Sequence, residues 1–117
     1  MNLAIVGSRS FHDYVVLQNV MNEHFNHFNI KKIISGGAKG ADTLAKLYAN
    51  AYNIELVEYL PDWDTYGKAA GPIRNELIIK DCDIVLAFWT GEKEHSGTYN
   101  GICIAHSLKK STFIYYV

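Results

Sequence analysis

Short apolar runs alternate with segments of helical periodicity along the whole chain, and this alternation is the feature that most restricts its fold. The apolar runs, each short enough for a strand, are residues 3–7, 31–36, 54–60, 83–89 and 111–117. The periodic segments between them predict helices at 14–28, 41–52, 71–82 and 98–109. Strands that alternate with helices are typical of a parallel sheet covered on both faces. We therefore expect one α/β domain over residues 1–117, a Rossmann-like three-layer sandwich with a five-stranded, mainly parallel sheet and helices on both faces.

The glycines and arginines gather at the connections that lead from a strand into a helix. All nine glycines follow an apolar run or open the next helix: they are Gly7, Gly36, Gly37, Gly40, Gly67, Gly71, Gly91, Gly97 and Gly101. Both arginines, Arg9 and Arg74, occupy the same kind of position. The opposite connections contain no glycine, and we expect Asn29 and Asn53 to supply left-handed turns there. Open α/β sheets bind ligands where strands end, and helix N-termini and guanidinium groups at that edge favour phosphate.

The stretch SGGAKGAD, residues 35–42, holds the densest group of these glycines. It fits neither G-x-G-x-x-G nor G-x-x-x-x-G-K-[ST], so it carries no Rossmann or Walker fingerprint. We expect the backbone of Ser35, Gly36, Gly37 and Ala38 to approach a ligand closely, with the next helix directed at a phosphate. The alternative is a tight turn without a ligand.

Four more residues at the strand ends are candidates for ligand contacts. After the first strand, Gly7 would allow a close approach, Ser8 would donate a hydrogen bond, and Arg9 would pair with phosphate. Asp42 falls where the second helix begins. It could contact ribose hydroxyls, but we favour the interpretation that its carboxylate stabilises the N-terminus of the helix.

The segment PDWDTYGKAAGPIRN supplies two aromatic and two polar candidates. Trp63 and Tyr66 could stack on a base, or they could pack as a lid on their own domain. Arg74 opens the third helix and is the strongest single candidate for a phosphate contact. Asn75 follows it and could hold a ribose or a base edge, or lie exposed on the helix.

Ser96, Gly97 and Thr98 precede the fourth helix. Small hydroxyl residues with a glycine at this position cap a helix and also bind phosphate, and the two roles are compatible. The chain shows no Ser-His-Asp order, no H-E-x-x-H motif and no paired carboxylates, so no catalytic residue is assigned. We expect neither a metal site nor a cofactor.

Charge and composition bear on the partners. The formal net charge is -1 and the isoelectric point is about 6.5, with no run of like charge. Binding to nucleic acid irrespective of sequence usually needs a basic stripe, so nucleic acid is the least favoured partner.

Cys82 and Cys103 form no C-x-x-C pair, and we expect free, buried thiols in a reducing cytosol. The pattern indicates no signal peptide and no membrane-spanning helix, so we expect a cytoplasmic protein without a membrane partner.

The motifs GSRSF, SGGAKGAD, PDWDTYGKAAGPIRN and SGT resemble, in that order, those of the YspA-like branch of the SLOG superfamily. The resemblance covers nearly the whole chain and implies a Rossmann-like fold that binds nucleotides or nucleotide-derived ligands. The superfamily includes the LOG phosphoribohydrolases, which cleave a base from a nucleoside monophosphate. It also includes sensor domains of defence systems such as Thoeris, which bind cyclic ADP-ribose-type signals, and, more distantly, DprA-like proteins, which bind single-stranded DNA.

The LOG motif can be compared with this chain position by position. Those enzymes place an arginine in the helix before a strand that ends in PGGxGTxxE, and Arg74 matches that arginine. Gly97 and Thr98 match the GT of the motif, whereas EHS replaces the PGG. The glutamate that assists cleavage would fall at Gly101, and glycine cannot act in its place. The resemblance thus implies a retained phosphate site without a recognisable catalytic carboxylate.

The expected function is to bind a small nucleotide-derived ligand at the carboxyl edge of the sheet. The ligand would be an ADP-ribose or cyclic ADP-ribose-like signal or a nucleoside phosphate, and the chain would act as a sensor or sequester the signal in a bacterial or phage-infected cell. The alternative is a nucleotide N-glycosidase in which Glu92 or Glu94 replaces the missing glutamate. Single-stranded nucleic-acid binding ranks below both, and a homodimer or higher homo-oligomer is expected.

Overall fold

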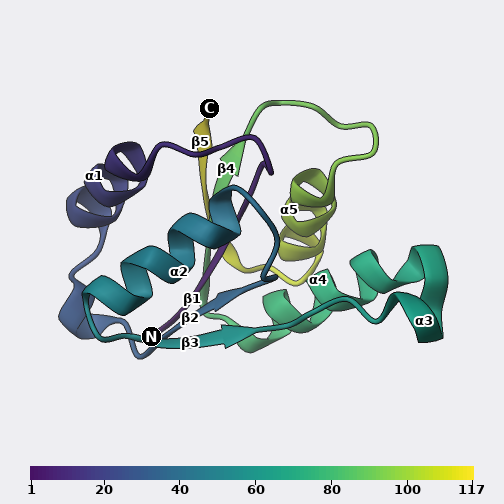
Figure 1. Cartoon of the computed structure of the whole chain (residues 1–117), viewed down its shortest axis with the longest axis horizontal. Helices are drawn as coiled ribbons and strands as arrows, with labels where there is room; N and C mark the ends of the chain where they lie inside the picture. The colour runs from purple at the N-terminus through teal and green to yellow at the C-terminus, as the bar shows by residue number, and fades with distance from the viewer.

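The computed structural model describes all of residues 1–117 and has a five-stranded sheet at its centre (Figure 1). The strands are β1 (Asn2–Gly7), β2 (Lys32–Ser35), β3 (Glu55–Glu58), β4 (Ile84–Trp89) and β5 (Ser111–Tyr116). They lie in the order β3-β2-β1-β4-β5, and every neighbouring pair is parallel. The predicted Rossmann-like α/β fold is confirmed, with a sheet that is wholly parallel.

Helices cover both faces of this sheet and complete the three layers (Figure 1). The first two pack on one face and the last two on the other: α1 (Tyr14–His24), α2 (Ala41–Ala51), α4 (Ala70–Asp81) and α5 (Gly97–Ser107). Three short elements lie in the connections: η1 (His27–Asn29), α3 (Trp63–Tyr66) and η2 (Gly67–Ala69). Only the four longer helices therefore contribute to the two layers over the sheet.

The central strand β1 shows how the sequence divides between the two cores. Successive side chains of a strand point to opposite faces. Leu3 and Ile5 accordingly lie in the larger core, beneath α1 and α2, and Ala4 lies in the smaller core, beneath α4 and α5. All three are fully buried, as a strand at the centre of a parallel sheet requires.

The strand order reverses between β1 and β4. From β1 the chain moves outward to β2 and β3, then crosses to β4, which pairs with β1 from Leu3 opposite Ile84 to Gly7 opposite Phe88. The carboxyl ends of β1 and β4 therefore flank a topological switch point, where open α/β sheets bind their ligands. The long connection from β4 to α5 leaves from this edge (Figure 1).

Some local predictions need correction. The helix predicted for residues 14–28 ends at His24, because Phe25 is extended, and Phe28 lies in η1 with 84% of its surface exposed. Asn53 adopts the expected left-handed conformation, with φ of 53°, but Asn29 does not. Lys109 supplies the left-handed residue between α5 and β5 instead, with φ of 57°.

The two cysteines lie in different environments. Both thiols are free, and Cys82 is buried as expected, but Cys103 is exposed on α5 and is not a core residue. No helix is both long enough and apolar enough to span a lipid bilayer.

Candidate functional site

A cavity of about 360 Å³ lies at the switch point, where the residues after β1, β2 and β4 meet the middle of α4 and the start of α5. Most of the predicted ligand-binding residues line it: Gly7, Ser8, Arg9, Gly36, Ala38, Asp42, Arg74, Asn75, Ser96, Gly97 and Thr98. Its volume falls in the range of about 300–1,000 Å³ that is usual for ligand sites. The structure thus brings together side chains that are up to about ninety positions apart in the sequence.

A groove of about 490 Å³ adjoins the cavity on the side of α3. Its lining is formed by Arg9, Gly36, Gly37, Ala38, Lys39, Thr43, Leu60, Pro61, Trp63 and Arg74. Gly37 and Trp63 therefore lie in the groove and not in the cavity. Of the other candidates, Ser35 is fully buried beneath the loop and Tyr66 is half-exposed, and neither lines the cavity or the groove.

Two glycines bring the backbone segments of the site together. A Cβ on Gly7 would lie 2.6 Å from the Cβ of Ala41 and 2.8 Å from the carbonyl oxygen of Phe88, so only glycine lets α2 begin this close to β1. Gly40 has φ of 78°, and a Cβ there would collide with the backbone of Ser8 and Arg9. Close packing within the protein therefore accounts for these two of the nine glycines without a ligand.

Arg74 is held by uncharged acceptors. Its Nη1 donates to the carbonyl oxygens of Gly36, at 2.8 Å, and Tyr59, at 3.5 Å, and its Nε donates to Oδ1 of Asn75 at 3.0 Å. No carboxylate lies within 4.0 Å, since the ion pairs of the chain are Lys32–Asp81 and Lys80–Glu76. Burial lowers the pKa of Arg74, and the nearby Asp42 partly offsets this effect. The cavity thus contains a partly buried guanidinium whose charge no contact ion pair neutralises.

Asp42 lies in the first turn of α2, as predicted, and is only 9% exposed. Its Oδ2 accepts a hydrogen bond of 3.1 Å from the amide of Ala38, so it fixes the glycine loop before its own helix. Burial raises the pKa of Asp42, although the Ala38 amide and the charge of Arg74 act in the opposite direction. A tight ion pair would lower the pKa of the acid and raise that of the base, whereas burial dominates for both groups here.

Asn75 holds the site together through its side-chain amide. Nδ2 donates to the carbonyl oxygen of Gly97 at 3.1 Å and to Oδ1 of Asn100 at 3.0 Å, while Oδ1 accepts from Arg74. The residue is 8% exposed, so the alternative of an exposed helix residue is wrong. Its amide connects the guanidinium on α4 to the first turn of α5, and both amide protons are already used within the protein.

The N-terminus of α5 is capped by the side chain of the residue that precedes it. Ser96 is the N-cap, and its Oγ accepts a hydrogen bond of 3.0 Å from the amide of Tyr99. Thr98 is buried in the first turn and lines the cavity. Gly101, the position of the LOG glutamate, lies in the same helix, and a Cβ there would meet open space.

The connection between β4 and α5 contributes residues that the sequence did not single out. Trp89, Thr90 and His95 line the cavity in addition to the predicted set, and so does Glu92, which was considered only as a substitute for the LOG glutamate. Trp89 stacks on Tyr99 with ring centroids 5.5 Å apart, and its Nε1 donates to the carbonyl oxygen of Glu92 at 2.8 Å. His95 has φ of 54°, a conformation that is uncommon for residues other than glycine. Their position directly after a strand at the switch point was the signal that could have found them.

The two acids that were weighed as substitutes for the LOG glutamate differ in position. Both are exposed, but only Glu92 lines the cavity. The carboxylate that is buried in the cavity is that of Asp42. No group of three or more His, Cys, Asp or Glu side chains is arranged to hold a metal ion.

Solved structures that resemble the fold include DNA processing protein A (DprA) from Streptococcus pneumoniae, with a TM-score of 0.76 and 22% identity. DNA processing protein A from Helicobacter pylori, studied for its unique single-stranded DNA binding mode, gives a TM-score of 0.72 and 19% identity. Each match covers 97% of this chain, which spans 49% of the first protein and 64% of the second. At these identities the likeness establishes the fold.

These neighbours contradict the expectation that nucleic acid is the least favoured partner, because a protein of this fold binds single-stranded DNA. A small molecule can therefore no longer be taken as the only class of partner. The expectation rested on a net charge of -1, which is a sum over the whole chain. A single strand meets only the local charge at its site, and Arg9, Lys39 and Arg74 all line one groove here.

Similarity in sequence assigns the chain to a family, whereas the solved structures establish only its fold. The Gene 61 protein of Mycobacterium phage D29 is 30% identical over 95 residues, which are 74% of this chain and 75% of that protein. The family model for "YspA, cpYpsA-related SLOG family" matches residues 1–66, which contain the GSRSF and SGGAKGAD motifs. The chain belongs to the YspA, cpYpsA-related SLOG family.

Proposed function

We propose that the cavity binds a small nucleotide-derived ligand through its phosphate group. The ligand class is an ADP-ribose derivative, linear or cyclic, or a nucleoside phosphate, and the protein acts as a sensor of this molecule or sequesters it. The observation that carries the proposal is the guanidinium of Arg74, which is half-buried at the switch point and paired with no carboxylate. Membership of a SLOG family supports a nucleotide-related ligand.

The surroundings of Arg74 support an anion as the occupant. Arg9 lines the same cavity, and its charge lowers the pKa of Arg74, so two cations face one space. Helix α5 begins at the cavity with Gly97 and adds the positive end of its dipole. A phosphate would receive charge-assisted hydrogen bonds from both guanidinium groups, which are stronger than those between neutral partners.

The N-glycosidase alternative needs a carboxylate beside the glycosidic bond. Glu92 and Asp42 are the acids that line the cavity. Asp42 is buried and holds the glycine loop through Ala38, whereas Glu92 is exposed on a loop. We favour binding without cleavage for two reasons. The carboxylate of Asp42 is already bound to the Ala38 amide, and neither Asp42 nor Glu92 occupies the position of the LOG glutamate.

Single-stranded DNA is a second candidate ligand. It is favoured by the likeness to DNA processing protein A from Helicobacter pylori and by the three cations that line the groove. Phosphates of a strand would contact these cations, and bases would stack on Trp63. The two candidates differ in their response to salt, since a strand releases counterions from several phosphates at once.

The test is a binding panel of nucleoside monophosphates, ADP-ribose, cyclic ADP-ribose isomers and an oligothymidylate, measured by calorimetry. Each ligand is then released by heat and identified by mass spectrometry. The Arg74→Ala variant is compared with Lys80→Ala, which removes the same charge from an exposed site on the same helix. A ligand that is recovered intact, with binding lost only in Arg74→Ala, supports the proposal.

Other outcomes contradict it in separate ways. Recovery of free base and ribose phosphate would make the protein a glycosidase, and Asp42→Asn and Glu92→Gln would then identify the acid. Binding of the oligothymidylate alone, with a steep loss of affinity in salt, would establish the second candidate. Equal binding by Arg74→Ala and wild type would mean that the cavity is not the site.

A further inference from the structure

We propose that the ligand of this site contains two nucleotide units joined through phosphate, one in the cavity and the second in the groove beside Trp63. The inference rests on the proposed function and adds the class of ligand.

The cavity and the groove are continuous. Arg9, Gly36, Ala38 and Arg74 line both, so the two guanidinium groups lie at the junction and not at the far end of either space. A phosphate held by Arg9 and Arg74 would therefore have room on both sides. A mononucleotide, with its phosphate at one end, would fill one side only.

The two spaces differ in the groups that they offer. On the cavity side, Ser8, Asp42 and Thr98 present hydroxyl and carboxylate oxygens of the kind that hold sugar hydroxyls. The groove is lined by Lys39 in addition to the two arginines, and no acidic residue lines it. The cavity differs, because the carboxylates of Asp42 and Glu92 line it beside the two arginines.

Apolar side chains are left uncovered in the groove. Leu60 is 69% exposed and Trp63 is 52% exposed, although both line a concave surface. Leu60 lies over Gly37, where an added Cβ would be 2.6 Å from its Cδ2. Exposed aromatic side chains between cations are the usual platform on which proteins stack nucleobases.

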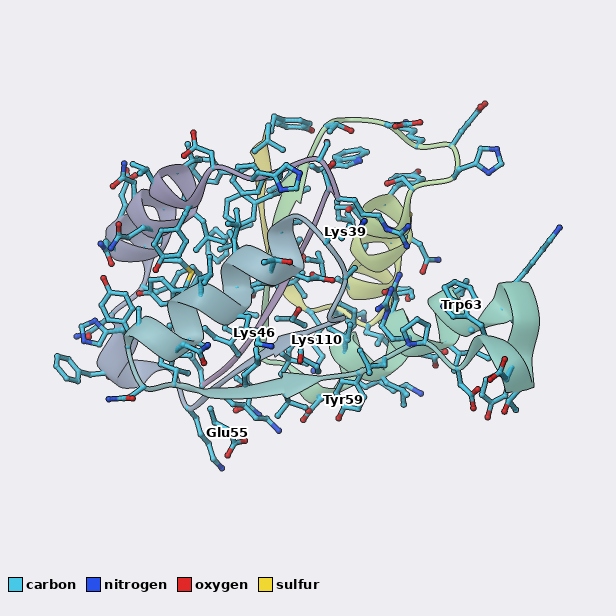
Figure 2. The ribbon with its side chains drawn as sticks, viewed as in Figure 1. Lys39, Lys46, Glu55, Tyr59, Trp63 and Lys110 are labelled. Carbon is cyan, nitrogen blue, oxygen red and sulfur yellow. The ribbon has the colours of Figure 1, made fainter.

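The position of Trp63 is fixed by its short helix and by the neighbouring helix α4. It opens α3, whose N-cap Asp62 accepts a hydrogen bond of 3.1 Å from the amide of Thr65. The edge of the indole ring lies beside Gly71 in α4, where an added Cβ would be 3.6 Å from it. Figure 2 shows Trp63 on α3 and Lys39 on the loop before α2, on the elements that border the groove. One face of the second unit would thus lie on the indole and its phosphate near Lys39.

The fluorescence of Trp63 can be used to measure binding in the groove. The chain has two tryptophans, and Trp89 is only 8% exposed. The difference in fluorescence between wild type and Trp63→Phe therefore reports on the groove. The probes are AMP, a pyrophosphate-linked dinucleotide, the dinucleotide pTpT and an oligothymidylate of twelve residues.

We expect the dinucleotides to quench Trp63 and to bind at least about 10-fold more tightly than AMP. Trp63→Ala should remove this advantage, and Trp63→Phe should retain part of it. Tyr66→Ala is the matched control, because Tyr66 is an aromatic residue of the same short helix, half-exposed, and lines neither space. Thermal unfolding checks that each variant is folded.

The probes separate the two sources of such a ligand. Saturation at one dinucleotide per chain, with no gain from a longer strand, identifies a free dinucleotide. Affinity that rises with strand length and falls steeply with salt identifies successive nucleotides of a single strand. Equal affinity for AMP and the dinucleotides, with no change in Trp63→Ala, would overturn the two-unit ligand but leave the phosphate site intact. If Arg74→Ala binds AMP and the dinucleotides as tightly as wild type does, the proposed function is overturned instead.

Discussion

The Nη1 of Arg74 donates a hydrogen bond of 2.8 Å to the carbonyl oxygen of Gly36, which joins α4 to the glycine loop after β2. Arg74 was expected to open its helix, but α4 begins at Ala70, so Arg74 lies in the second turn. The two residues are 38 positions apart in the sequence. Gly36 has no side chain to obstruct this contact, and a Cβ there would collide with Nη1 of Arg74. The glycine therefore makes room for the arginine, and the arginine lies where the cavity and the groove meet.

Gly36→Ala is predicted to weaken binding of ADP-ribose by about 10-fold, because the displaced guanidinium loses its fixed position. Gly101→Ala is the control. Its Cβ meets open space inside α5, so it should leave affinity unchanged and stabilise the protein by about 0.5–1 kcal/mol. Calorimetry and urea unfolding give the two quantities. Unchanged affinity in Gly36→Ala would show that the position of Arg74 does not determine binding.

Binding of an anionic ligand is predicted to strengthen as the pH falls through the raised pKa of Asp42. Burial raises this pKa, so Asp42 takes up a proton at a higher pH than an ordinary aspartate and then no longer offsets the charge of Arg74. The probe should be a phosphate diester, since a monoester itself titrates near pH of about 6. The pH dependence should disappear in Asp42→Asn.

The same raised pKa fixes the sign of the effect of Asp42 on stability. A group whose pKa is higher in the folded state adds stability below its unfolded value, and that stability is lost as the pH rises through the folded value. The difference in unfolding free energy between wild type and Asp42→Asn should thus favour wild type more at acidic than at neutral pH. The opposite slope in urea unfolding would contradict the burial of this carboxyl group.

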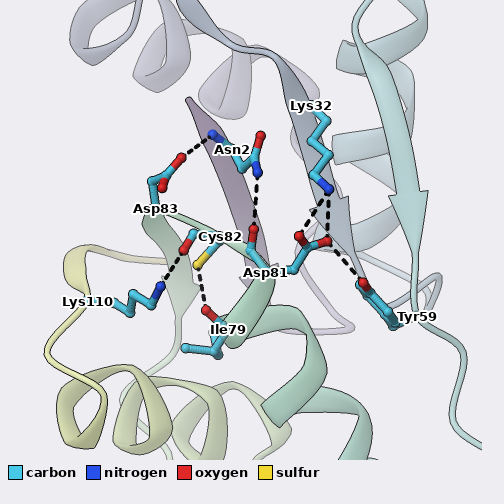
Figure 3. A network of polar contacts seen from close by, with 8 residues as sticks. All are labelled: Asn2, Lys32, Tyr59, Ile79, Asp81, Cys82, Asp83 and Lys110. Carbon is cyan, nitrogen blue, oxygen red and sulfur yellow. Dashed lines mark hydrogen bonds and ion pairs between the residues drawn. The ribbon is translucent and has the colours of Figure 1, made fainter.

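The opposite edge of the sheet carries a polar network that serves stability (Figure 3). Asp81 accepts hydrogen bonds from Nζ of Lys32, at 3.0 and 3.1 Å, and from the hydroxyl of Tyr59, at 3.0 Å. We expect Asp81→Ala to lower the Tm by about 4 °C or more and to leave ligand affinity unchanged. Glu76→Ala breaks the exposed pair with Lys80 on the same helix and should have little effect.

This network also predicts the behaviour at high pH. The hydrogen bonds with Asp81 raise the pKa of Lys32 and of Tyr59. The stabilising contribution of both groups is therefore complete below their ordinary pKa values of 10.5 and 10.0 and is lost as the pH rises through the raised values. The Tm difference between wild type and Asp81→Ala should narrow above those values.

Ser96 allows capping and ligand binding to be separated. Ser96→Ala removes the cap of α5 and should cost about 1 kcal/mol of unfolding free energy. Ser96→Asp retains a capping oxygen and should keep most of the stability, but it places a negative charge in the cavity and should weaken binding of ADP-ribose. Equal affinity of Ser96→Asp and wild type would argue against an anion at the start of α5.

The fold could be predicted because the lengths of the apolar runs and the periodicity of the segments between them both indicated alternating strands and helices. Apolar runs such as LAIVG have the length of a buried strand, and the stripes between them have the period of a helix. The end of α1 was misplaced because Phe25 and Phe28 continue the apolar stripe past His24. Periodicity cannot show that the backbone becomes extended at Phe25.

The edge of the sheet at which the cavity lies was also predictable, but the contacts of single residues were not. Gly7 was expected to let a ligand approach the end of the first strand, yet a Cβ there would collide with Ala41 and Phe88, so the glycine permits close packing inside the protein. Asn75 was considered for a ribose contact, yet its amide connects Arg74 to Gly97. Such roles depend on neighbours that are distant in sequence, and no local pattern contains them.

The central claim is that Arg74 holds the phosphate of the ligand, and calorimetric titration of ADP-ribose into Arg74 variants tests it most directly. The account predicts that Arg74→Ala weakens binding by at least about 10-fold. Arg74→Lys should recover only part of this, because an ammonium lacks the planar fork of donors, and Lys80→Ala should bind as wild type does. Affinity in Arg74→Ala equal to that of wild type would contradict the account.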